Sequence, residues 1–284
     1  MNPITMKLVV DDLILQALRE DITFEDVSTA SVCPTARPAT VELIAKADGI
    51  IAGLDVFART FELLDSQSSV LLDVADGDEV HAGDHVGQVR GDARVLLSGE
   101  RVALNYLQRM SGIATYTHSM AAALEGTKTV LVDTRKTTPG MRVLDKMAVK
   151  IGGGENHRMG LFDMILLKDN HIDFAGGIRP AIEGVRRYLA AKGKTIPIEC
   201  EVRTLEDIDE VFAAGGVDRI MFDNFTPAMT REAVQKVAGR CETESSGGIT
   251  LDTLREYAET GVDFISVGAL THQIKSLDMS LKAC

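Results

Sequence analysis

The sequence predicts an α/β fold in which parallel strands alternate with helices. After Lys128, apolar runs short enough for buried strands alternate with amphipathic stretches that have helical spacing. Polar residues follow each apolar run, as expected where the carboxyl ends of parallel strands gather at one edge. The chain has 284 residues, which suits one large domain or two ordinary ones. A βα barrel and a doubly wound open sheet both fit this alternation.

The composition indicates the class of protein and the partners it excludes. Hydrophobic residues make up 45% of the chain and charged residues 25%, which is typical of a globular protein with a sizeable core. The formal net charge of −12 argues against binding to nucleic acid or to an anionic membrane surface. No apolar run approaches the roughly 18 residues of a membrane span, and the four widely separated cysteines fit a reducing compartment. We therefore expect a cytoplasmic protein.

The first third of the sequence mixes helices with short strands. Apolar residues within 10–18 recur at helical spacing, and residues 41–46 alternate as in a half-buried strand. Residues 69–92 hold short β-prone runs between glycine-containing turns. A long helix is predicted over 94–124, with a break at 111–112 that would mark a kink or a domain boundary.

The remainder of the chain carries the alternating pattern. The apolar runs predicted as strands are 129–133, 164–168, 196–202, 219–223 and 263–268. The amphipathic stretches predicted as helices are 141–152, 178–192, 205–215, 227–239 and 251–261. The polar residues that end these strands would meet at one mouth, where the chemistry of such folds takes place.

Residues 133–168 carry a local excess of positive charge. They include seven Lys and Arg residues and four Asp and Glu residues, a net charge of +3 in a chain of −12. Arg135, Lys136 and Lys168 directly follow predicted strands, so we expect them to form a pocket for a small polyanion. Lys146 and Lys150 are four residues apart on a predicted helix, which suggests solvated charges on its outer face.

Two glycine-containing loops could hold phosphate. Residues 244–248 (ESSGG) precede a predicted helix, so the hydroxyls of Ser245 and Ser246 and the glycine amides could bind an anion. Gly268 lies in a second such loop, at the end of the last predicted strand. The glycines of 151–158 fit a tight turn and the approach of an anion equally well.

Glu201 and Asp223 end two consecutive predicted strands. Paired carboxylates at one mouth can hold Mg²⁺ or act as a base. They could also form ion pairs with the cationic residues nearby. Because the surroundings are cationic, we expect both carboxylates to stay ionised, which favours a metal or a cation over proton uptake.

Five motifs together resemble those of the quinolinate phosphoribosyltransferase family. They are DTRKTTPG (133–140), GGGENHRMGLFD (152–163), ILLKDNHI (165–172), ESSGG (244–248) and VGALTH (267–272), in this order. The resemblance covers nearly the whole chain, and the succession of DTRKT, NHR and KDNH is highly specific. Arg203 is a departure, because an acidic or neutral residue is frequent there in the family. It is either structural or changes the charge of the mouth.

The resemblance implies two domains and an oligomer. An N-terminal α/β sandwich domain over 1–112 would be joined by the C-terminal tail, 274–284. An open βα barrel with fewer than eight strands would cover 113–273. The assembly would be a homodimer, or a hexamer of dimers, in which Arg101 is donated across the interface to the active site of the neighbouring subunit.

The resemblance also implies a reaction, with residues assigned to it. The enzyme would transfer phosphoribose from phosphoribosyl pyrophosphate to quinolinate with Mg²⁺ as cofactor, releasing CO₂ and pyrophosphate and giving nicotinate mononucleotide for NAD biosynthesis. The residues that bind quinolinate would be Arg101, Arg135, His157, Arg158 and Lys168. The catalytic residues would be Lys136, Glu201 and Asp223, with Mg²⁺ held by Glu201 and Asp223. The residues near the phosphates would be Ser246, Gly247, Gly268 and His272.

Two other interpretations stay open at this point. A paralogue, the molybdenum-operon pyrophosphorylase-like protein, shares TRKT-type motifs but matches the NHR and KDNH strings less well. A non-catalytic binder of anionic metabolites would have a decayed active site, whereas every family position that can be mapped is present here. Nucleic-acid binding is excluded, because the cationic residues would lie in a concave mouth of an otherwise acidic chain.

Overall fold

The computed structural model describes residues 2–284 and divides the chain into two compact units. The first unit holds the chain up to His118 together with Thr138–Gly153 and Gln273–Cys284. The second unit holds Ser119–Thr137 and Gly154–His272. Thr138–Gly153 therefore belongs to the first unit, although the predicted division placed it in the barrel domain.

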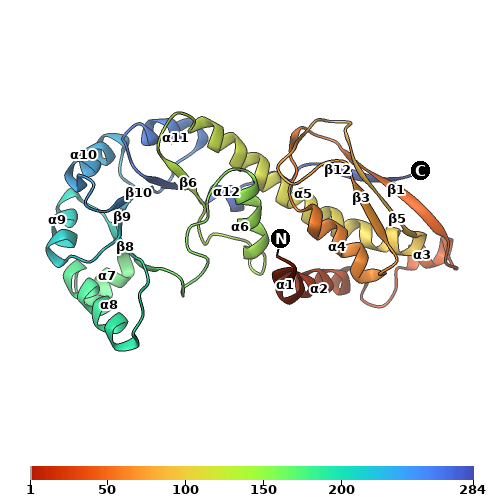
Figure 1. The fold of residues 1–284 in the computed structure, drawn as a ribbon, viewed down its shortest axis with the longest axis horizontal. Coiled ribbons are helices and arrows are strands. Elements are labelled where there is room, and N and C mark those ends of the chain that lie inside the picture. The colour runs from red at the N-terminus through yellow and green to blue at the C-terminus, as the bar shows by residue number, and fades with distance from the viewer. Residues whose placement is uncertain (1) are drawn as a thin grey trace. The chain divides into compact units, whose positions relative to one another are not determined.

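A four-stranded antiparallel sheet organises the first unit (Figure 1). Its order is β12 (Met279–Ala283), β1 (Pro38–Ala45), β5 (His85–Asp92) and β3 (Ser69–Leu72). A separate two-stranded ladder joins β2 (Gly49–Ile50) to β4 (Glu79–Val80). The helices of this unit are α1 (Pro3–Thr5), the π-helix η1 (Met6–Val10), α2 (Asp11–Ile22), α3 (Val27–Val32), α4 (Leu54–Leu64), most of α5 (Ala93–Ala123) and α6 (Arg142–Ile151).

An apolar core fills the first unit. Phe57 and Phe61, one turn apart on α4, are fully buried and meet edge to face with ring centroids 5.3 Å apart. They belong to one cluster with Leu43 of β1, Val89 of β5 and Leu104 of α5. Burying a side chain of this size stabilises the fold by about 1.5–3 kcal/mol. The core of this unit is therefore a conventional hydrophobic one.

Helix α5 runs unbroken from Ala93 to Ala123, so the predicted break in its middle is wrong. The two residues behind that prediction serve close packing. The Oγ of Ser111 accepts the amide N–H of Ala52 at 3.0 Å. A Cβ at Gly112 would collide with the backbone of residues 275–276. The small residues mark the place where the C-terminal segment crosses the helix, and the helix itself continues.

Helix α6 packs within the first unit. The guanidinium of Arg109, on α5, donates from Nε and Nη2 to the two carboxylate oxygens of Asp145, each at 3.0 Å. Residues 144–146 and 148–149 are all buried, so the helix is enclosed over much of its circumference. Lys146 is fully buried, and the prediction that it is a solvated charge is wrong. Lys150 is exposed, as predicted.

Six parallel strands form the second unit (Figure 1). Their order in the sheet is β6 (Val130–Val132), β11 (Phe264–Ser266), β10 (Glu242–Ser246), β9 (Arg219–Asp223), β8 (Ile198–Val202) and β7 (Ile165–Leu167). Strands β6 and β7 follow one another in the chain but form the two edges of the sheet, so the barrel stays open between them. This confirms the predicted α/β fold with an open barrel of fewer than eight strands.

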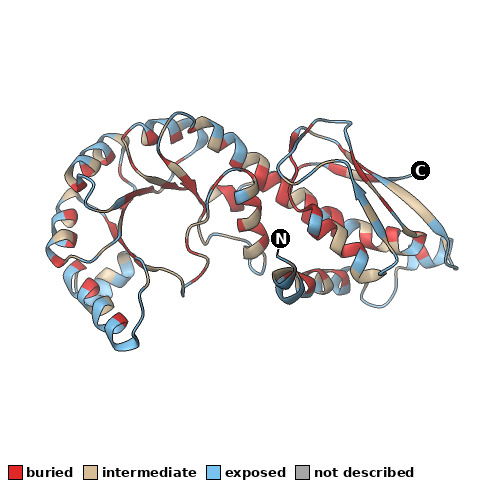
Figure 2. Cartoon of the chain, viewed as in Figure 1, coloured by how far each residue is buried: buried red, intermediate tan, exposed pale blue. Residues whose placement is uncertain are grey.

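Helices cover the outside of the open barrel. They are α7 (Asp169–Ala175), α8 (Ile178–Lys192), α9 (Leu205–Ala214), α10 (Pro227–Val237), α11 (Leu251–Ala258) and α12 (Ala269–His272). Figure 2 shows that α8, α9 and α10 are buried toward the strands and exposed on their outer sides. Within residues 2–284, no helix is long and apolar enough to cross a membrane.

Strand β10 was not among the predicted strands. Its sequence, ETESS, has no apolar run, because its inner face carries charge. The strand register places Glu242 beside Arg219 of β9 and Glu244 beside Met221. The interior of the barrel therefore holds ion pairs where a hydrophobic filling is usual, and the hydrophobic pattern could not reveal the strand.

Candidate active site

The carboxyl ends of the six parallel strands form one edge of the second unit, which we call the mouth. Every predicted site residue except Arg101 belongs to this unit. Strand β6 leads to Arg135 and Lys136, and β7 leads to Lys168. Glu201 lies near the end of β8, and Asp223 is the last residue of β9. The mouth therefore brings cations and carboxylates from four strands together, as predicted.

Two arginines at the mouth lie in each other's electrostatic field. Burial lowers the pKa of Arg158, and the positive charge of Arg135 lowers it further. The side chain of Arg158 donates to the carbonyl oxygen of Met164 at 3.3 Å. The Nε of Arg135 is buried and has no hydrogen-bond partner among residues 2–284. Two guanidinium groups that repel one another and still have donors to offer are suited to bind an anion between them.

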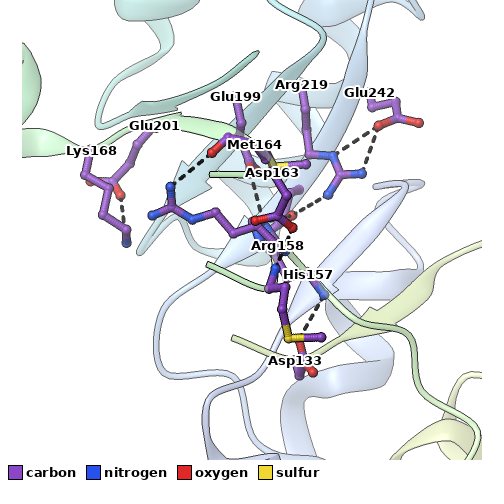
Figure 3. A network of polar contacts seen from close by, with 12 residues as sticks. Asp133, His157, Arg158, Asp163, Met164, Lys168, Glu199, Glu201, Arg219 and Glu242 are labelled. Atoms are coloured by element: carbon purple, nitrogen blue, oxygen red, sulfur yellow. Dashed lines mark hydrogen bonds and ion pairs between the residues drawn. The ribbon is translucent and has the colours of Figure 1, made fainter. Parts of the chain in front are cut away.

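Glu201 is enclosed by groups from two strands. Its carboxylate lies 3.5 Å from the Nζ of Lys168 and accepts the amide N–H of Asp169 at 3.3 Å (Figure 3). Burial raises the pKa of Glu201 and the charge of Asp223 adds to the rise, while Lys168 opposes it. The expectation that cations would keep this carboxylate readily ionised is therefore wrong in direction. A further cation between Glu201 and Asp223 would relieve their repulsion.

Asn224 orients Asp223. Its Nδ2 donates to a carboxylate oxygen of Asp223 at 2.7 Å, and its backbone N–H donates to the carbonyl of Ser246 at 2.8 Å. Asn224 has a positive φ of 56°, a conformation that asparagine tolerates better than most residues. Gly247 has a φ of 102°, and a Cβ there would collide with the Asn224 side chain. Gly247 is therefore required for the Asp223–Asn224 pair to fit.

Gly268 makes room for the side chains of Lys136 and His272. A Cβ at this position would lie 2.8 Å from the Cδ of Lys136 and 2.9 Å from the Nε2 of His272. Thr271, on α12, donates its hydroxyl to the Lys136 carbonyl at 2.9 Å, which fixes the loop after β6. The structure thus brings Lys136, Gly268 and His272 together, at the end of the strand that pairs with β6.

His157 lies inside the barrel. Its side chain is only 6% exposed, and its Nε2 is 2.9 Å from a Glu199 oxygen (Figure 3). The same Nε2 is 3.3 Å from a Glu244 oxygen. Its Nδ1 accepts the backbone N–H of Arg158 at 2.8 Å. Both ring nitrogens are therefore engaged by the protein. The predicted contact of this ring with quinolinate stays a prediction.

The groups around His157 form a buried cluster, consisting of His157, Glu199, Arg219 and Glu244. Burial and the charge of Glu244 raise the pKa of Glu199 to about 7. Burial opposes ionisation of Glu244, but the His157 hydrogen bond and the Arg219 charge outweigh it and lower the pKa of Glu244. Arg219 lies 2.9 Å from Glu244 and also packs over the ring of Phe264, with 3.7 Å to the centroid.

Glu199 and Glu244 also change the pKa of His157. Burial lowers the pKa of His157, but its hydrogen bonds to Glu199 and Glu244 outweigh burial and raise the pKa to about 9. A proton on Nε2 suits both carboxylates, whereas the 2.8 Å contact of Nδ1 with the Arg158 amide requires Nδ1 to be unprotonated. The raised pKa therefore opposes this contact, because the charged ring carries a proton on both nitrogens.

Three predicted residues need a correction or a qualification. Ser245 is buried within β10, so its hydroxyl is not part of a phosphate loop, whereas Ser246 ends the strand at the mouth. Arg101 is exposed on α5, in the first unit. Arg203 is half exposed and pairs with Asp173 at 3.3 Å and Asp169 at 3.8 Å, so it ties the loop after β8 to α7.

Sequence reasoning missed four residues that shape the site. They are Asp133, Glu199, Asn224 and Glu244. Asp133 is fully buried and accepts the backbone N–H of His157 at 2.8 Å. Glu199 alternates with Cys200 in the predicted strand 196–202, and a carboxylate at an inward position of a buried strand was the signal available there. Asn224 directly follows the predicted strand 219–223, so its position at a strand end was the signal there. Glu244 gave no comparable signal, since β10 itself was not recognised.

Two sets of carboxylates could hold a metal ion. Glu201 and Asp223 offer only oxygens, the ligands that Mg²⁺ prefers, and their mutual repulsion would be relieved by a cation. His157, Glu199 and Glu244 place potential ligand atoms within 4.8 Å of one another. This second set already has the Arg219 charge beside it, and its imidazole suits other metals than Mg²⁺. The pair at the mouth fits Mg²⁺ better.

Comparison with known proteins covers almost the whole chain. The family description "Quinolinate phosphoribosyl transferase, N-terminal domain" matches residues 21–111, and "Quinolinate phosphoribosyl transferase, C-terminal domain" matches residues 113–282. The chain is 43% identical over 281 residues to the probable nicotinate-nucleotide pyrophosphorylase (carboxylating) of Bacillus subtilis (strain 168), covering 99% of this chain and 94% of that protein. These matches include both units.

Further relatives agree with this result. The chain is 45% identical over 271 residues to the chloroplastic nicotinate-nucleotide pyrophosphorylase (carboxylating) of Oryza sativa subsp. japonica, covering 90% of this chain and 72% of that protein. The crystal structure of NadC from Streptococcus pyogenes superimposes with a TM-score of 0.92 at 42% identity, covering 99% of this chain and 97% of that chain. Sequence and fold therefore point to the same family.

Proposed function

Because the chain belongs to the quinolinate phosphoribosyltransferase family, we propose that its barrel mouth binds quinolinate beside Arg135 and Arg158 and the second substrate beside Lys136. The enzyme transfers phosphoribose from phosphoribosyl pyrophosphate to quinolinate with decarboxylation, and it forms nicotinate mononucleotide in de novo NAD biosynthesis. The assignment of residues to this reaction is the proposal, and it rests on the geometry of the mouth.

The observation that carries the proposal is the pair of like-charged guanidinium groups at the mouth. Arg135 lowers the pKa of Arg158, so the two cations oppose each other without a ligand. Quinolinate carries two carboxylates, and guanidinium forks bind carboxylates in a planar, bidentate manner. Lys168, which is 48% exposed beside Glu201, would supply a third cation. The carboxylates of bound quinolinate would attract both guanidinium groups and so offset the repulsion between them.

The phosphoribosyl end would occupy the strand ends on the other side of the open sheet. Lys136 and His272 lie against Gly268, after β6 and β11. Ser246 ends β10, which lies next to β11 in the sheet, and Gly247 directly follows it. Cations and glycine amides at neighbouring strand ends are typical of phosphate sites in βα barrels. Lys136 would be a catalytic residue that stabilises the leaving pyrophosphate.

Glu201 and Asp223 would hold the Mg²⁺ that this reaction uses. The ion would supply positive charge to neutralise the pyrophosphate group when bound. The two carboxylates would also stabilise positive charge that develops on the ribose as pyrophosphate departs. Asn224 would keep Asp223 in place through its 2.7 Å hydrogen bond.

The chemistry would proceed by substitution at the ribose. The arginines would orient quinolinate so that its ring nitrogen attacks C1 of the ribose, forming the N–C bond as the bond to pyrophosphate breaks. Loss of CO₂ from the adjacent carboxylate then leaves an electron pair on the pyridine ring, which takes up a proton. Nearby cations would stabilise the negative charge that develops in this step.

The proposal extends to the assembly and its setting. Arg101 is exposed on α5 in the first unit, and we propose a homodimer in which it enters the mouth of the partner subunit. A guanidinium group there would complete the dicarboxylate site. The four cysteines are all free, which supports the proposed cytoplasmic setting.

The test is turnover of quinolinate by the purified enzyme. We expect CO₂ and nicotinate mononucleotide to form from quinolinate and phosphoribosyl pyrophosphate with Mg²⁺. Removal of the metal with EDTA should stop turnover, and added Mg²⁺ should restore it. Arg135→Ala should raise the KM for quinolinate by at least about tenfold. An unchanged KM for quinolinate in Arg135→Ala would contradict the proposed position of the substrate.

A further inference from the structure

We propose that Asp163 is a positioning residue for quinolinate binding, because its carboxylate closes the loop that holds Arg158 at the mouth. This inference rests on the proposed function, in which Arg158 binds the dicarboxylate. It assigns a role to the last residue of the motif GGGENHRMGLFD (152–163), which the proposed function leaves unused. Asp163 would act through Arg158 and would not touch the substrate.

Residues 159–163 form a loop without helix or strand between Arg158 and β7. One carboxylate oxygen of Asp163 accepts the backbone N–H of Met159 at 2.7 Å, and the other accepts that of Gly160 at 2.9 Å. Hydrogen bonds to a carboxylate are stronger than those to a neutral acceptor. The chain directly after Arg158 is therefore tied to the chain directly before Met164.

The two ends of this loop also meet through the Arg158 side chain. Its Nη1 donates to the carbonyl oxygen of Met164, the residue after Asp163, at 3.3 Å (Figure 3). This contact is long for a hydrogen bond and would hold the guanidinium only weakly by itself. It persists only while Met164 stays beside Arg158, which the two contacts of Asp163 ensure. The position of the guanidinium therefore depends on Asp163.

Hydrophobic packing does not fix the tip of this loop. Leu161 and Phe162 are 74% and 73% exposed. A Cβ at Gly160 would lie 2.5 Å from the Phe162 ring, so this ring folds back over the loop itself. Segments with few buried apolar contacts open easily unless other contacts hold them. The order of the loop therefore relies on the hydrogen bonds inside it.

The charge of Asp163 supports the same role. Burial lowers the pKa of Arg158 and the charge of Arg135 lowers it further, whereas the negative charge of Asp163 opposes both. The carboxylate thereby offsets part of the repulsion between the two guanidinium groups when no substrate is bound. An Arg158 side chain that is already in place reduces the cost of ordering it when quinolinate binds.

Direct contact of Asp163 with quinolinate is the alternative. Both oxygens of Asp163 already accept backbone amides. A carboxylate would also repel the two carboxylates of quinolinate. A positioning role avoids both difficulties, and it makes the effect of Asp163 depend on the presence of Arg158.

The test is a double-mutant cycle between Asp163 and Arg158. Asp163→Asn keeps the size of the side chain but removes its charge and one of its two acceptors. We expect it to raise the KM for quinolinate by about tenfold and to change the KM for phosphoribosyl pyrophosphate by less than about twofold. In the Arg158→Ala background, the same substitution should raise the KM for quinolinate by less than about twofold, because the residue that it acts through is gone.

Asp76→Asn and Phe162→Ala are the matched controls. Asp76 also accepts two backbone amides, from Gly53 at 2.8 Å and from Leu54 at 3.0 Å, but it lies in the first unit. Phe162→Ala changes the same loop and keeps the hydrogen bonds of Asp163. We expect both controls to leave the KM for each substrate unchanged. A tenfold rise in the KM for quinolinate in Phe162→Ala would overturn the inference, since any change in the loop would then have this effect.

A second variant, Asp163→Ser, keeps the inference testable if Asp163→Asn fails to fold. The serine hydroxyl can accept one amide but carries no charge. We expect the same selective rise in the KM for quinolinate. An equal rise in the KM of both substrates, no rise in either folded variant, or failure of both variants to fold would overturn the inference. A tenfold rise in the Arg158→Ala background would also overturn it, since Asp163 would then act without Arg158.

Arg158→Ala alone separates this inference from the proposed function. If Arg158→Ala leaves the KM for quinolinate unchanged, the arginine site itself is wrong and both claims fall. If Arg158→Ala raises that KM and the Asp163 variants do not, only the positioning role falls.

Discussion

The four-stranded sheet of the first unit and the six-stranded sheet of the second unit bury different chemistry. The first encloses an apolar cluster that includes Phe57 and Phe61. The second encloses the ion pairs of His157, Glu199 and Glu244. Buried apolar area stabilises a fold, whereas buried charge contributes little net stability and fixes geometry. The difference indicates that the first unit mainly stabilises the fold and that the second unit mainly positions the substrate. Substitutions in the two units should therefore have different effects on stability and on kinetics.

The largest effect is expected at the carboxylates of the mouth. Glu201→Gln should lower kcat by about a thousandfold, because it removes a negative charge that stabilises the positive charge developing on the ribose in the transition state. The melting temperature should change little. The control is Asp209→Asn, whose carboxylate is 69% exposed on α9 and pairs with Lys236 at 2.7 Å. CO₂ release measures the change in kcat, and thermal unfolding measures the change in melting temperature. A large loss of stability in Glu201→Gln would show that this carboxylate also stabilises the fold.

The core of the first unit should show the opposite behaviour. Phe61→Ala should lower the free energy of unfolding by about 3–5 kcal/mol, since it leaves a cavity in a packed cluster. The KM for quinolinate of the remaining folded enzyme should stay unchanged. Phe174→Ala is the control, because Phe174 is 91% exposed on α7 and should cost almost nothing. Urea unfolding measures the stability of each variant, and steady-state kinetics measure its KM for quinolinate. An altered KM in Phe61→Ala would show that the core of the first unit also affects substrate binding.

Complementation between subunits tests whether the first unit nevertheless contributes one residue to catalysis. Arg101→Ala should lower kcat/KM for quinolinate by about a hundredfold, as expected for the loss of a charged contact. Mixing Arg101→Ala with Arg135→Ala subunits should restore about a quarter of wild-type activity, because half of the dimers would hold one complete site. Mixed dimers without regained activity would refute the shared site.

The smallest effect is expected at Arg203. Its ion pairs with Asp169 and Asp173 are about half exposed, and pairs of this kind contribute about 0–1 kcal/mol. Arg203→Ala should therefore change the KM for quinolinate by less than about twofold and stability only slightly. Arg187→Ala, on the outer face of α8, is the matched control. A tenfold rise in that KM for Arg203→Ala alone would show that Arg203 acts on the charge of the mouth.

The sequence allowed much of the second unit to be predicted, for a physical reason. Strands β6, β7, β9 and β11 are apolar runs with polar residues directly after them, and both features are local in sequence. Residues such as Lys168 and Asp223 could therefore be located at strand ends. Motif resemblance added His157 and Arg158, which no strand end indicates. The overall α/β class follows from these local signals, whereas the open barrel was implied by the family resemblance.

The features that could not be predicted depend on tertiary packing. Strand β10 has no apolar residue and buries a charged one, Glu244, so its pattern is that of a polar loop. The burial of Lys146 depends on the enclosure of α6 and not on its helical spacing. In the sequence Gly112 resembles a helix breaker. Only the structure shows that the backbone of residues 275–276 crosses the helix there and leaves no room for a side chain. The enclosure of the His157 ring depends on Glu199 and Glu244, which are 42 and 87 residues away along the chain.

A crystal structure of the enzyme with quinolinate bound would test the central claim most directly. The account predicts that the quinolinate carboxylates accept hydrogen bonds from Arg135 and Arg158 at the mouth. Quinolinate bound away from Arg135 and Arg158 would contradict the account.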